Sequence, residues 1–191
     1  MRITLVRHGE SEGNTRVHDY TVAGDHLVRL TEKGQQQAHE AGLLIRERFN
    51  AAYGQLPLVY CSPYLRTRQT LEGLLAGAAP TYRPRVFEDP RLRETDHGYS
   101  DVEEQEAMRK IHGFFYYRFA GGESPADCFD RVSTFLESMM RQVDRKKTNE
   151  IIIVAHGLTI RCFVMRFLHM TVEQFESVSY THLRAHETRG N

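Results

Sequence analysis

Two short stretches at opposite ends of the chain decide the fold: Ile3-Thr4-Leu5-Val6-Arg7-His8-Gly9 and Ile151-Ile152-Ile153-Val154-Ala155-His156-Gly157. Each begins with an apolar run, which is typical of a buried strand, and ends in a His-Gly pair, which predicts a polar loop. The carboxyl ends of parallel strands lie along one edge of an α/β sheet, and ligands bind at that edge. We therefore expect the two histidines to meet in one site.

Strand and helix patterns alternate between these two stretches. Leu58–Cys61 and Arg85–Phe87 are predicted to be strands, and 89–98 is predicted to be a loop. Thr31 and Ser62 are predicted to be N-caps of the first two helices. Helices are expected over 32–49, from Ser62-Pro63 through Thr70, over 125–143 and over 158–168. This order predicts an α/β protein, a three-layer sandwich in which a mostly parallel central sheet has helices on both faces.

The composition is that of an ordinary globular domain, and it argues against several classes of function. Lys plus Arg (25) equals Asp plus Glu (25), so neither nucleic acid nor an anionic membrane is expected as the main partner. The cysteines Cys61, Cys128 and Cys162 have no C-x-x-C spacing, which argues against a disulfide framework and a thiolate zinc site. No signal peptide or membrane-length apolar run is present, so we expect a cytoplasmic protein.

The last residues differ in character from the rest of the chain. The segment from Val178 to Thr188 matches, residue for residue, what one frame of a common transposon-based sequencing-library adapter would encode. We therefore expect 1–177 to be a single domain and 178–191 to be a non-native tail. The alternative is an ordinary polar terminus. Resequencing of the source gene past codon 177 distinguishes the two.

Charged residues beside the two histidines favour a phosphoryl group as ligand. Arg7 and Arg66 lie just past predicted strands, and a guanidinium binds two phosphoryl oxygens while staying charged. Gly157 is expected to begin a helix whose N–H groups attract an anion, and the glycine after each histidine would let a ligand approach the backbone. Positive charge nearby disfavours protonation of His8, and a neutral imidazole is a competent nucleophile.

An alcohol leaving group needs a proton donor, and Glu94 is the best-placed carboxyl. The spacing does not by itself exclude Glu88, Asp89 or Asp96, which lie in the same stretch. The remaining histidines have no spacing that suits a metal site, and we interpret them as solvated surface residues. This group consists of His18, His26, His39, His97, His112 and His169.

Several motifs along the chain occur in the same order as those of a known family. They are Leu5-Val6-Arg7-His8-Gly9-Glu10-Ser11-Glu12-Gly13-Asn14, Gly24-Asp25, Leu30-Thr31-Glu32-Lys33-Gly34, Ser62-Pro63-Tyr64-Leu65-Arg66-Thr67-Arg68-Gln69-Thr70, Leu92-Arg93-Glu94 with Gly98, Gly121-Gly122-Glu123-Ser124 and Val154-Ala155-His156-Gly157. Together they resemble the histidine phosphatase superfamily, the phosphoglycerate mutase-like proteins, over nearly the whole chain up to Glu176.

The resemblance implies a role for each matching residue. His8 would become phosphohistidine, and His156 would contact the phosphoryl group. Glu94 would act first as general acid and then as the base that activates water. The resemblance also implies that no metal or other cofactor takes part. The phosphoryl oxygens and substrate would be held by Arg7, Arg66, Asn14, Ser11 and Gly157, although Asn14 is alternatively a turn residue.

The resemblance is closest to the short, phosphatase-like branch. It implies a metal-independent phosphatase that acts on small phosphorylated metabolites through phosphohistidine at His8. A phosphoglycerate mutase with the same intermediate and a non-catalytic module that binds a phosphorylated ligand or a protein are the alternatives. The aromatic run 114–119 either walls the substrate pocket or packs against the sheet. The sequence predicts no oligomeric state.

Overall fold

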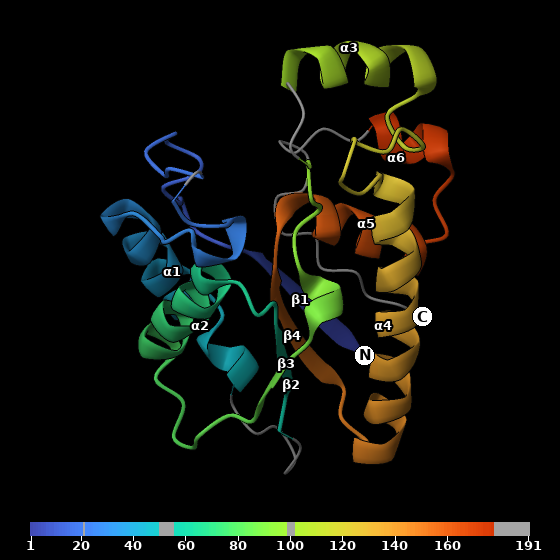
Figure 1. Cartoon of the computed structure of the whole chain (residues 1–191). Coiled ribbons are helices and arrows are strands. Elements are labelled where there is room, and N and C mark those ends of the chain that lie inside the picture. Colours follow the sequence, from blue (N-terminus) through green and yellow to red (C-terminus); the bar gives the residue numbers. More distant parts are fainter. Residues whose placement is uncertain (21, 50–55, 99–101, 178–191) are drawn as a thin grey trace. The chain divides into compact units, whose positions relative to one another are not determined.

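The computed structural model describes residues 1–20, 22–49, 56–98 and 102–177 (Figure 1). The expected non-native tail, 178–191, lies outside the described residues. The chain divides into two compact units. The first comprises Met1–Arg93 and Gln142–His156, and the second comprises Glu94–Arg141 and the segment that begins at Gly157.

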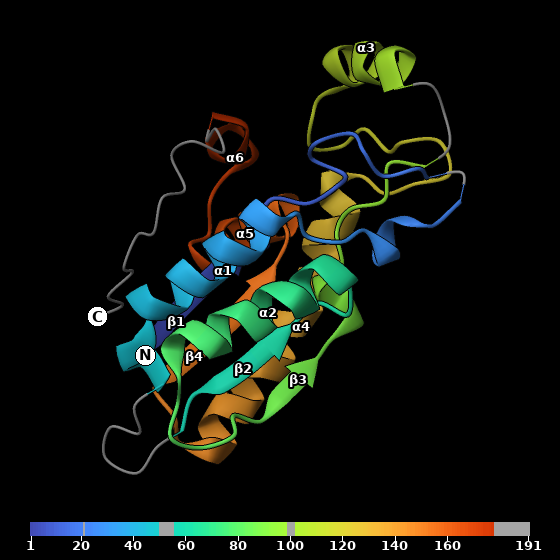
Figure 2. The same cartoon turned by 90° about the vertical axis from the view of Figure 1, so that its left-hand side faces the viewer.

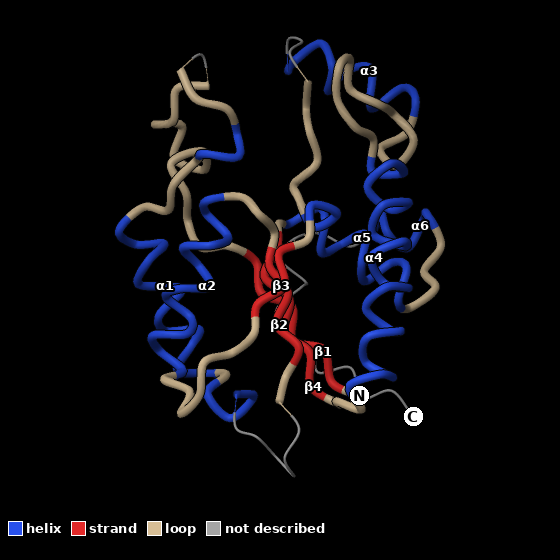
Figure 3. Tube along the Cα trace, turned by 60° about the horizontal axis from the view of Figure 1, so that its bottom comes forward, coloured by secondary structure: helices blue, strands red, loops and turns tan. Residues whose placement is uncertain are grey.

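The first unit contains a parallel sheet. Its strands are β1 (Arg2–Arg7), β2 (Leu58–Cys61), β3 (Val86–Glu88) and β4 (Glu150–Ala155). They lie in the order β1-β4-β2-β3, and all three neighbouring pairs are parallel. The strands are drawn in red in Figure 3. The first and last strands of the sequence are therefore neighbours, as the two His-Gly stretches predict. The α/β class with a parallel sheet is confirmed.

Both faces of the sheet are buried around its central strands. On one face Ile152 and Val154 pack with Val59 and Leu74 in an apolar cluster. The alternate side chains Ile151 and Ile153 point to the opposite face and are also buried. A strand that is buried on both faces reads as a continuous apolar run, which is why β4 has the most strand-like sequence of the chain.

Two helices, α1 (Glu32–Leu44) and α2 (Leu65–Ala78), lie side by side in the first unit (Figure 2). The Thr31 side chain accepts a hydrogen bond from the Gly34 amide, so the predicted N-cap is confirmed. The α-helix predicted to reach Phe49 ends at Leu44, and a 3-10 turn follows. Close approach of the two helices requires Gly42, since a Cβ there would lie 2.2 Å from a main-chain oxygen of α2.

The second predicted N-cap is wrong. The residue that caps α2 is Tyr64, which makes no side-chain capping bond, and Ser62 lies before the helix. Short 3-10 helices complete the first unit. They are η1 (Asp25–Leu27), η2 (Arg46–Phe49) and η4 (Pro90–Leu92).

The second unit is helical. It contains α3 (Val102–His112), most of α4 (Pro125–Lys146), α5 (Gly157–Phe167) and α6 (Val172–Ser177). The sequence patterns predicted α4 and α5 but neither α3 nor α6. In the part of the chain that the structure describes, no helix has the length and apolar character needed to cross a membrane.

The aromatic run forms part of the core of the second unit. Phe115 and Phe119 are buried, and the Phe115 ring contacts the rings of Phe129 and Phe175. Tyr116, which is 66% exposed, and Arg118 are the members of the run that face solvent. The expected packing against the sheet is not what these contacts show: the Phe115 ring packs against residues of the helices α4 and α6.

Candidate active site

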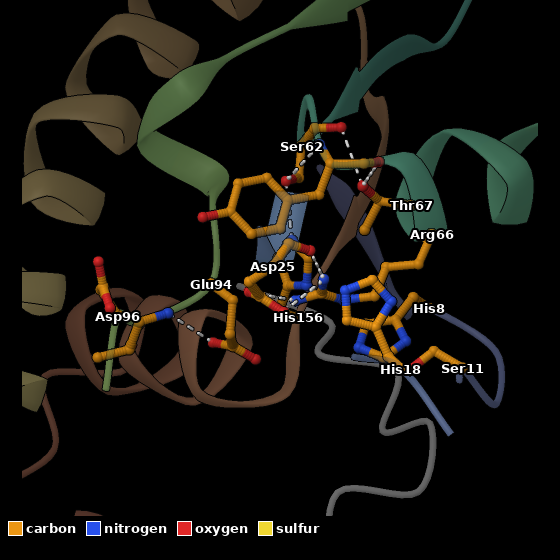
Figure 4. A network of polar contacts seen from close by, with 12 residues as sticks. His8, Ser11, His18, Asp25, Ser62, Arg66, Thr67, Glu94, Asp96 and His156 are labelled. Carbon is orange, nitrogen blue, oxygen red and sulfur yellow. Dashed lines mark hydrogen bonds and ion pairs between the residues drawn. The ribbon is translucent and has the colours of Figure 1, made fainter. Parts of the chain in front are cut away.

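The ends of β1 and β4 bring two histidines together. Arg7 pairs with Ala155 in the parallel register, so the residues that follow both strands leave the sheet side by side. The His8 amide donates to the Ala155 carbonyl at 3.1 Å. The imidazole centroids of His8 and His156 lie 5.3 Å apart, with the rings inclined at 61°. The predicted meeting of the two rings at one sheet edge is confirmed (Figure 4).

The His8 ring is buried and held in one tautomer. Its Nδ1 lies 2.8 Å from the Gly9 carbonyl oxygen, which only accepts, so Nδ1–H is the donor and Nε2 carries the lone pair. The His8 pKa is lowered from 6.5 to about 4. Burial is the largest cause, and the positive charges of Arg66 and Arg7 act in the same direction, whereas the Gly9 hydrogen bond and the charge of Asp25 oppose the shift. The cations are the only cause that the sequence suggests, whereas burial is the larger one.

The glycine after His8 allows close packing of the backbone. A Cβ on Gly9 would lie 2.4 Å from the carbonyl oxygen of Gly34, in the first turn of α1. Gly9 therefore lets the start of α1 approach the backbone beside His8. The Gly9 amide donates to the Thr70 hydroxyl, which ties the same loop to α2.

His156 is completely buried beside β2. Its Nε2 lies 2.8 Å from the Ser62 hydroxyl oxygen (Figure 4). The Tyr64 ring meets the imidazole edge-on at a centroid distance of 5.1 Å. Sequence reasoning missed both partners because it assigned Ser62 to a helix cap. The available signal was position: Ser62 directly follows the strand that pairs with β4.

Arg66, on the first turn of α2, is 4% exposed and is held by one residue of the η1 loop. Its Nη1 donates to the main-chain oxygen of Asp25 at 2.6 Å and to Oδ1 at 3.0 Å, and its Nη2 donates to Oδ2 at 3.0 Å. Arg66 acts electrostatically on His8, which places its charge beside the ring. Asp25 belongs to a motif that the sequence analysis quoted without giving it a role.

Three other predicted residues occupy the loop side of β1. Arg7 ends the strand and is exposed, and its charge also acts on His8. The Ser11 amide and hydroxyl both donate to Oδ1 of Asn14, at 3.0 and 2.9 Å. Asn14 thus stabilises a turn, the alternative that the sequence analysis left open.

Glu94 and Gly157 belong to the second unit. Oε1 of Glu94 accepts hydrogen bonds from the Thr95 amide at 3.0 Å and from the Thr159 hydroxyl at 3.4 Å. Gly157 is the first residue of α5, as predicted.

Two of the alternative carboxylates are engaged in ion pairs within the first unit. Glu88 pairs with Arg68 at 2.7 Å. Asp89 pairs with Arg91 at 2.6 Å and caps η4. These contacts favour structural roles for both residues.

The interpretation of every other histidine as solvated is wrong for His18. Only 8% of its side chain is exposed, Nε2 lies 2.9 Å from the Ala23 carbonyl oxygen, and the ring packs edge-on against Tyr20. A carbonyl partner and an aromatic contact make it a packing residue of the loop that carries Asp25. Among the residues that the structure describes, no group of three or more His, Cys, Asp or Glu side chains could hold a metal ion.

Comparison with known proteins agrees with this geometry. The model of the histidine phosphatase superfamily (branch 1) matches residues 3–190. A phosphoglycerate mutase-like protein of Arabidopsis thaliana, AT74, is 41% identical over 93% of this chain, and the chain spans 61% of that relative's length. The broad-range acid phosphatase DET1 of Saccharomyces cerevisiae is 27% identical over 92% of this chain and 80% of its own length.

A solved structure shares the fold. Mycobacterial glucosyl-3-phosphoglycerate phosphatase superposes with a TM-score of 0.73, at 21% identity over 93% of this chain and 84% of its own. At this level of identity the likeness concerns the fold alone.

Proposed function

Because the chain belongs to the histidine phosphatase superfamily, branch 1, we propose that it is a phosphatase that hydrolyses small phosphomonoesters through a phosphohistidine on His8. One observation carries the proposal. The His8 ring is neutral by virtue of its pKa of about 4, and its Nδ1–H is fixed on the Gly9 carbonyl. A buried neutral imidazole with a directed Nε2 lone pair is a nucleophile prepared for attack.

In the first step, the Nε2 lone pair of His8 forms a bond to phosphorus as the bond from phosphorus to the ester oxygen breaks. The departing alkoxide takes up a proton from the Glu94 carboxyl. We assign this role to Glu94 from its place in the sequence motif. Arg7, Arg66 and His156 would stabilise the charge on the transferring phosphoryl group.

In the second step, water attacks phosphorus and gives its proton to the Glu94 carboxylate. The bond from phosphorus to nitrogen breaks, and its electron pair returns to Nε2. The products are an alcohol and inorganic phosphate, and His8 and Glu94 regain their starting protonation states.

The nucleophile is tested by trapping the intermediate. Protein exposed to ³²P-labelled aryl phosphate and quenched in alkaline detergent should carry label that is stable to base and labile to acid, as a phosphohistidine is. His8→Ala should lose both label and turnover, and His112→Ala, a change in the exposed last turn of α3, should retain both. Labelling of His8→Ala would place the nucleophile elsewhere.

A phosphoglycerate mutase is the second candidate, and the name of the Arabidopsis relative favours it. It would return the phosphoryl group from His8 to a second hydroxyl instead of to water. With 3-phosphoglycerate and a bisphosphoglycerate primer, isomerisation faster than phosphate release would indicate the mutase. We expect phosphate release to be faster.

A further inference from the structure

We propose that Asp25 is a positioning residue for phosphoryl binding: it clamps one edge of the Arg66 guanidinium so that the other edge is presented to the phosphoryl group. This inference rests on the proposed function and extends it to a residue outside the catalytic set. Asp25 acts through Arg66 and touches no reacting atom.

The contacts of Arg66 divide its five N–H donors into two groups. Both hydrogens of Nη1 and one hydrogen of Nη2 point to Asp25, two to carboxylate oxygens and one to the main-chain oxygen. The remaining donors, Nε–H and the second hydrogen of Nη2, lie on the adjacent edge and form a fork. Such a fork matches two oxygens of a phosphoryl group.

The backbone of Asp25 is itself held in place by the η1 turn. The Asp25 main-chain oxygen also accepts from the Val28 amide at 3.3 Å, within the η1 turn, so the loop fixes the carbonyl that orients Nη1. The side chain of Asp25 is 44% exposed, whereas that of Arg66 is 5% exposed. The buried guanidinium is therefore the partner that is held in place. The carboxylate stays partly in contact with solvent, so its desolvation cost is small.

The Tyr64 ring restrains the guanidinium from a second direction. The Arg66 Cζ lies 5.0 Å from the centroid of that ring, and the same ring meets His156 at 5.1 Å. Asp25, Arg66, Tyr64 and His156 thus form one continuous set of contacts. A guanidinium fixed at this point has lost its rotational freedom before the ligand arrives, which lowers the entropy cost of binding.

A simple count of charges predicts the opposite effect. A carboxylate beside an anion site repels the anion, so its removal would strengthen phosphate binding. The clamp predicts weaker binding, because an unrestrained guanidinium must be ordered again by the ligand. The sign of the change therefore separates the two explanations.

The test is titration calorimetry of inorganic phosphate with the full chain, together with steady-state kinetics on an aryl phosphate. Asp25→Asn should weaken phosphate binding and raise KM roughly five- to tenfold, a change of about 1–1.4 kcal/mol, with a smaller effect on kcat. Asp25→Glu should recover part of the loss, since a longer carboxylate still offers two oxygens. Glu40→Gln, an identical charge change on the exposed side of α1, should bind phosphate as the wild type does.

Thermal unfolding of each variant checks that it folds, and Asp25→Ser replaces the asparagine variant under the same criteria if that variant does not fold. Unchanged or tighter phosphate binding in Asp25→Asn, or in Asp25→Ser where it is used instead, would overturn the proposed role of Asp25. A wild-type protein that neither binds phosphate nor hydrolyses the ester would instead overturn the proposed function itself.

Discussion

The hydroxyl oxygen of Ser62 lies 2.8 Å from Nε2 of His156, joining two residues that are 94 positions apart. The contact is completely buried, and it arises because β2 and β4 are neighbours whose following residues leave the same edge of the sheet. With Nε2 engaged by Ser62, the contact that we propose between His156 and a phosphoryl oxygen falls to Nδ1. Ser62 would therefore determine which ring nitrogen of His156 contacts the ligand.

Ser62→Ala should lower kcat/KM about tenfold and destabilise the fold by about 1–3 kcal/mol, because it leaves a buried ring nitrogen without its hydroxyl partner. Urea unfolding and steady-state kinetics measure the two effects. Ser133→Ala removes a hydroxyl that donates to the Phe129 carbonyl in the preceding turn of α4. It should leave kcat/KM unchanged and alter stability by no more than a few tenths of a kcal/mol. Wild-type kcat/KM in Ser62→Ala would show that the ring keeps its orientation without the serine.

The pH dependence of stability should contain a contribution from His8. Its pKa is about 4 in the folded protein and 6.5 when unfolded, so the unfolded state binds more protons between these values. The titration of His8 therefore leaves the free energy of unfolding unchanged above pH 6.5. It lowers this free energy as the pH drops from 6.5 to about 4, and causes no further loss below about pH 4. The full contribution is about 3 kcal/mol.

Urea unfolding of wild type and His8→Asn at pH 7 and pH 4.5 measures this contribution. The wild type should lose more stability than the variant over that interval, because asparagine has no proton to gain. The same depressed pKa predicts that kcat/KM stays high down to about pH 4 before protonation of His8 reduces it. Parallel stability curves for the two proteins would contradict the low pKa.

The sequence was sufficient to predict the sheet edge and the pairing of its two histidines. The apolar runs before His8 and His156 mark strands, and parallel strands deliver their ends to one edge. Long-range partners of single side chains were not predictable. Ser62 had a local interpretation as a helix cap, and only the tertiary pairing of β2 with β4 gives it a histidine partner.

Asp25 and α3 escaped prediction for different reasons. The Asp25 carboxylate reaches Arg66 across 41 positions, a distance at which spacing carries no information. The α3 sequence lacks a strong apolar stripe, because its residues are largely charged and exposed, so periodicity gave no signal there. Its position depends on contacts such as that between Gln105 and the Tyr117 hydroxyl.

Gly9→Ala should destabilise the protein by about 1–3 kcal/mol, since the new Cβ would lie 2.4 Å from the Gly34 carbonyl oxygen and backbone must move to relieve the overlap. The adjoining His8 ring should shift with it and lower kcat. Gly24→Ala is the matched control, because its φ is −67° and its Cβ would meet only the His26 ring. Differential scanning calorimetry compares the two. Equal melting temperatures for Gly9→Ala and wild type would show that α1 yields easily.

Glu94→Gln should reduce turnover according to the leaving group. Expulsion of an alkoxide needs the proton that Glu94 supplies, whereas dinitrophenolate leaves unprotonated. We expect a loss of 10²-fold or more, on the order of the usual general-acid contribution, for an alkyl phosphate and a much smaller loss in phosphoenzyme formation for 2,4-dinitrophenyl phosphate. Glu88→Gln removes a carboxylate that is paired with Arg68 and should affect both substrates equally. Burst kinetics separate phosphoenzyme formation from its hydrolysis, and the same loss with both leaving groups in Glu94→Gln would assign the acid to another residue.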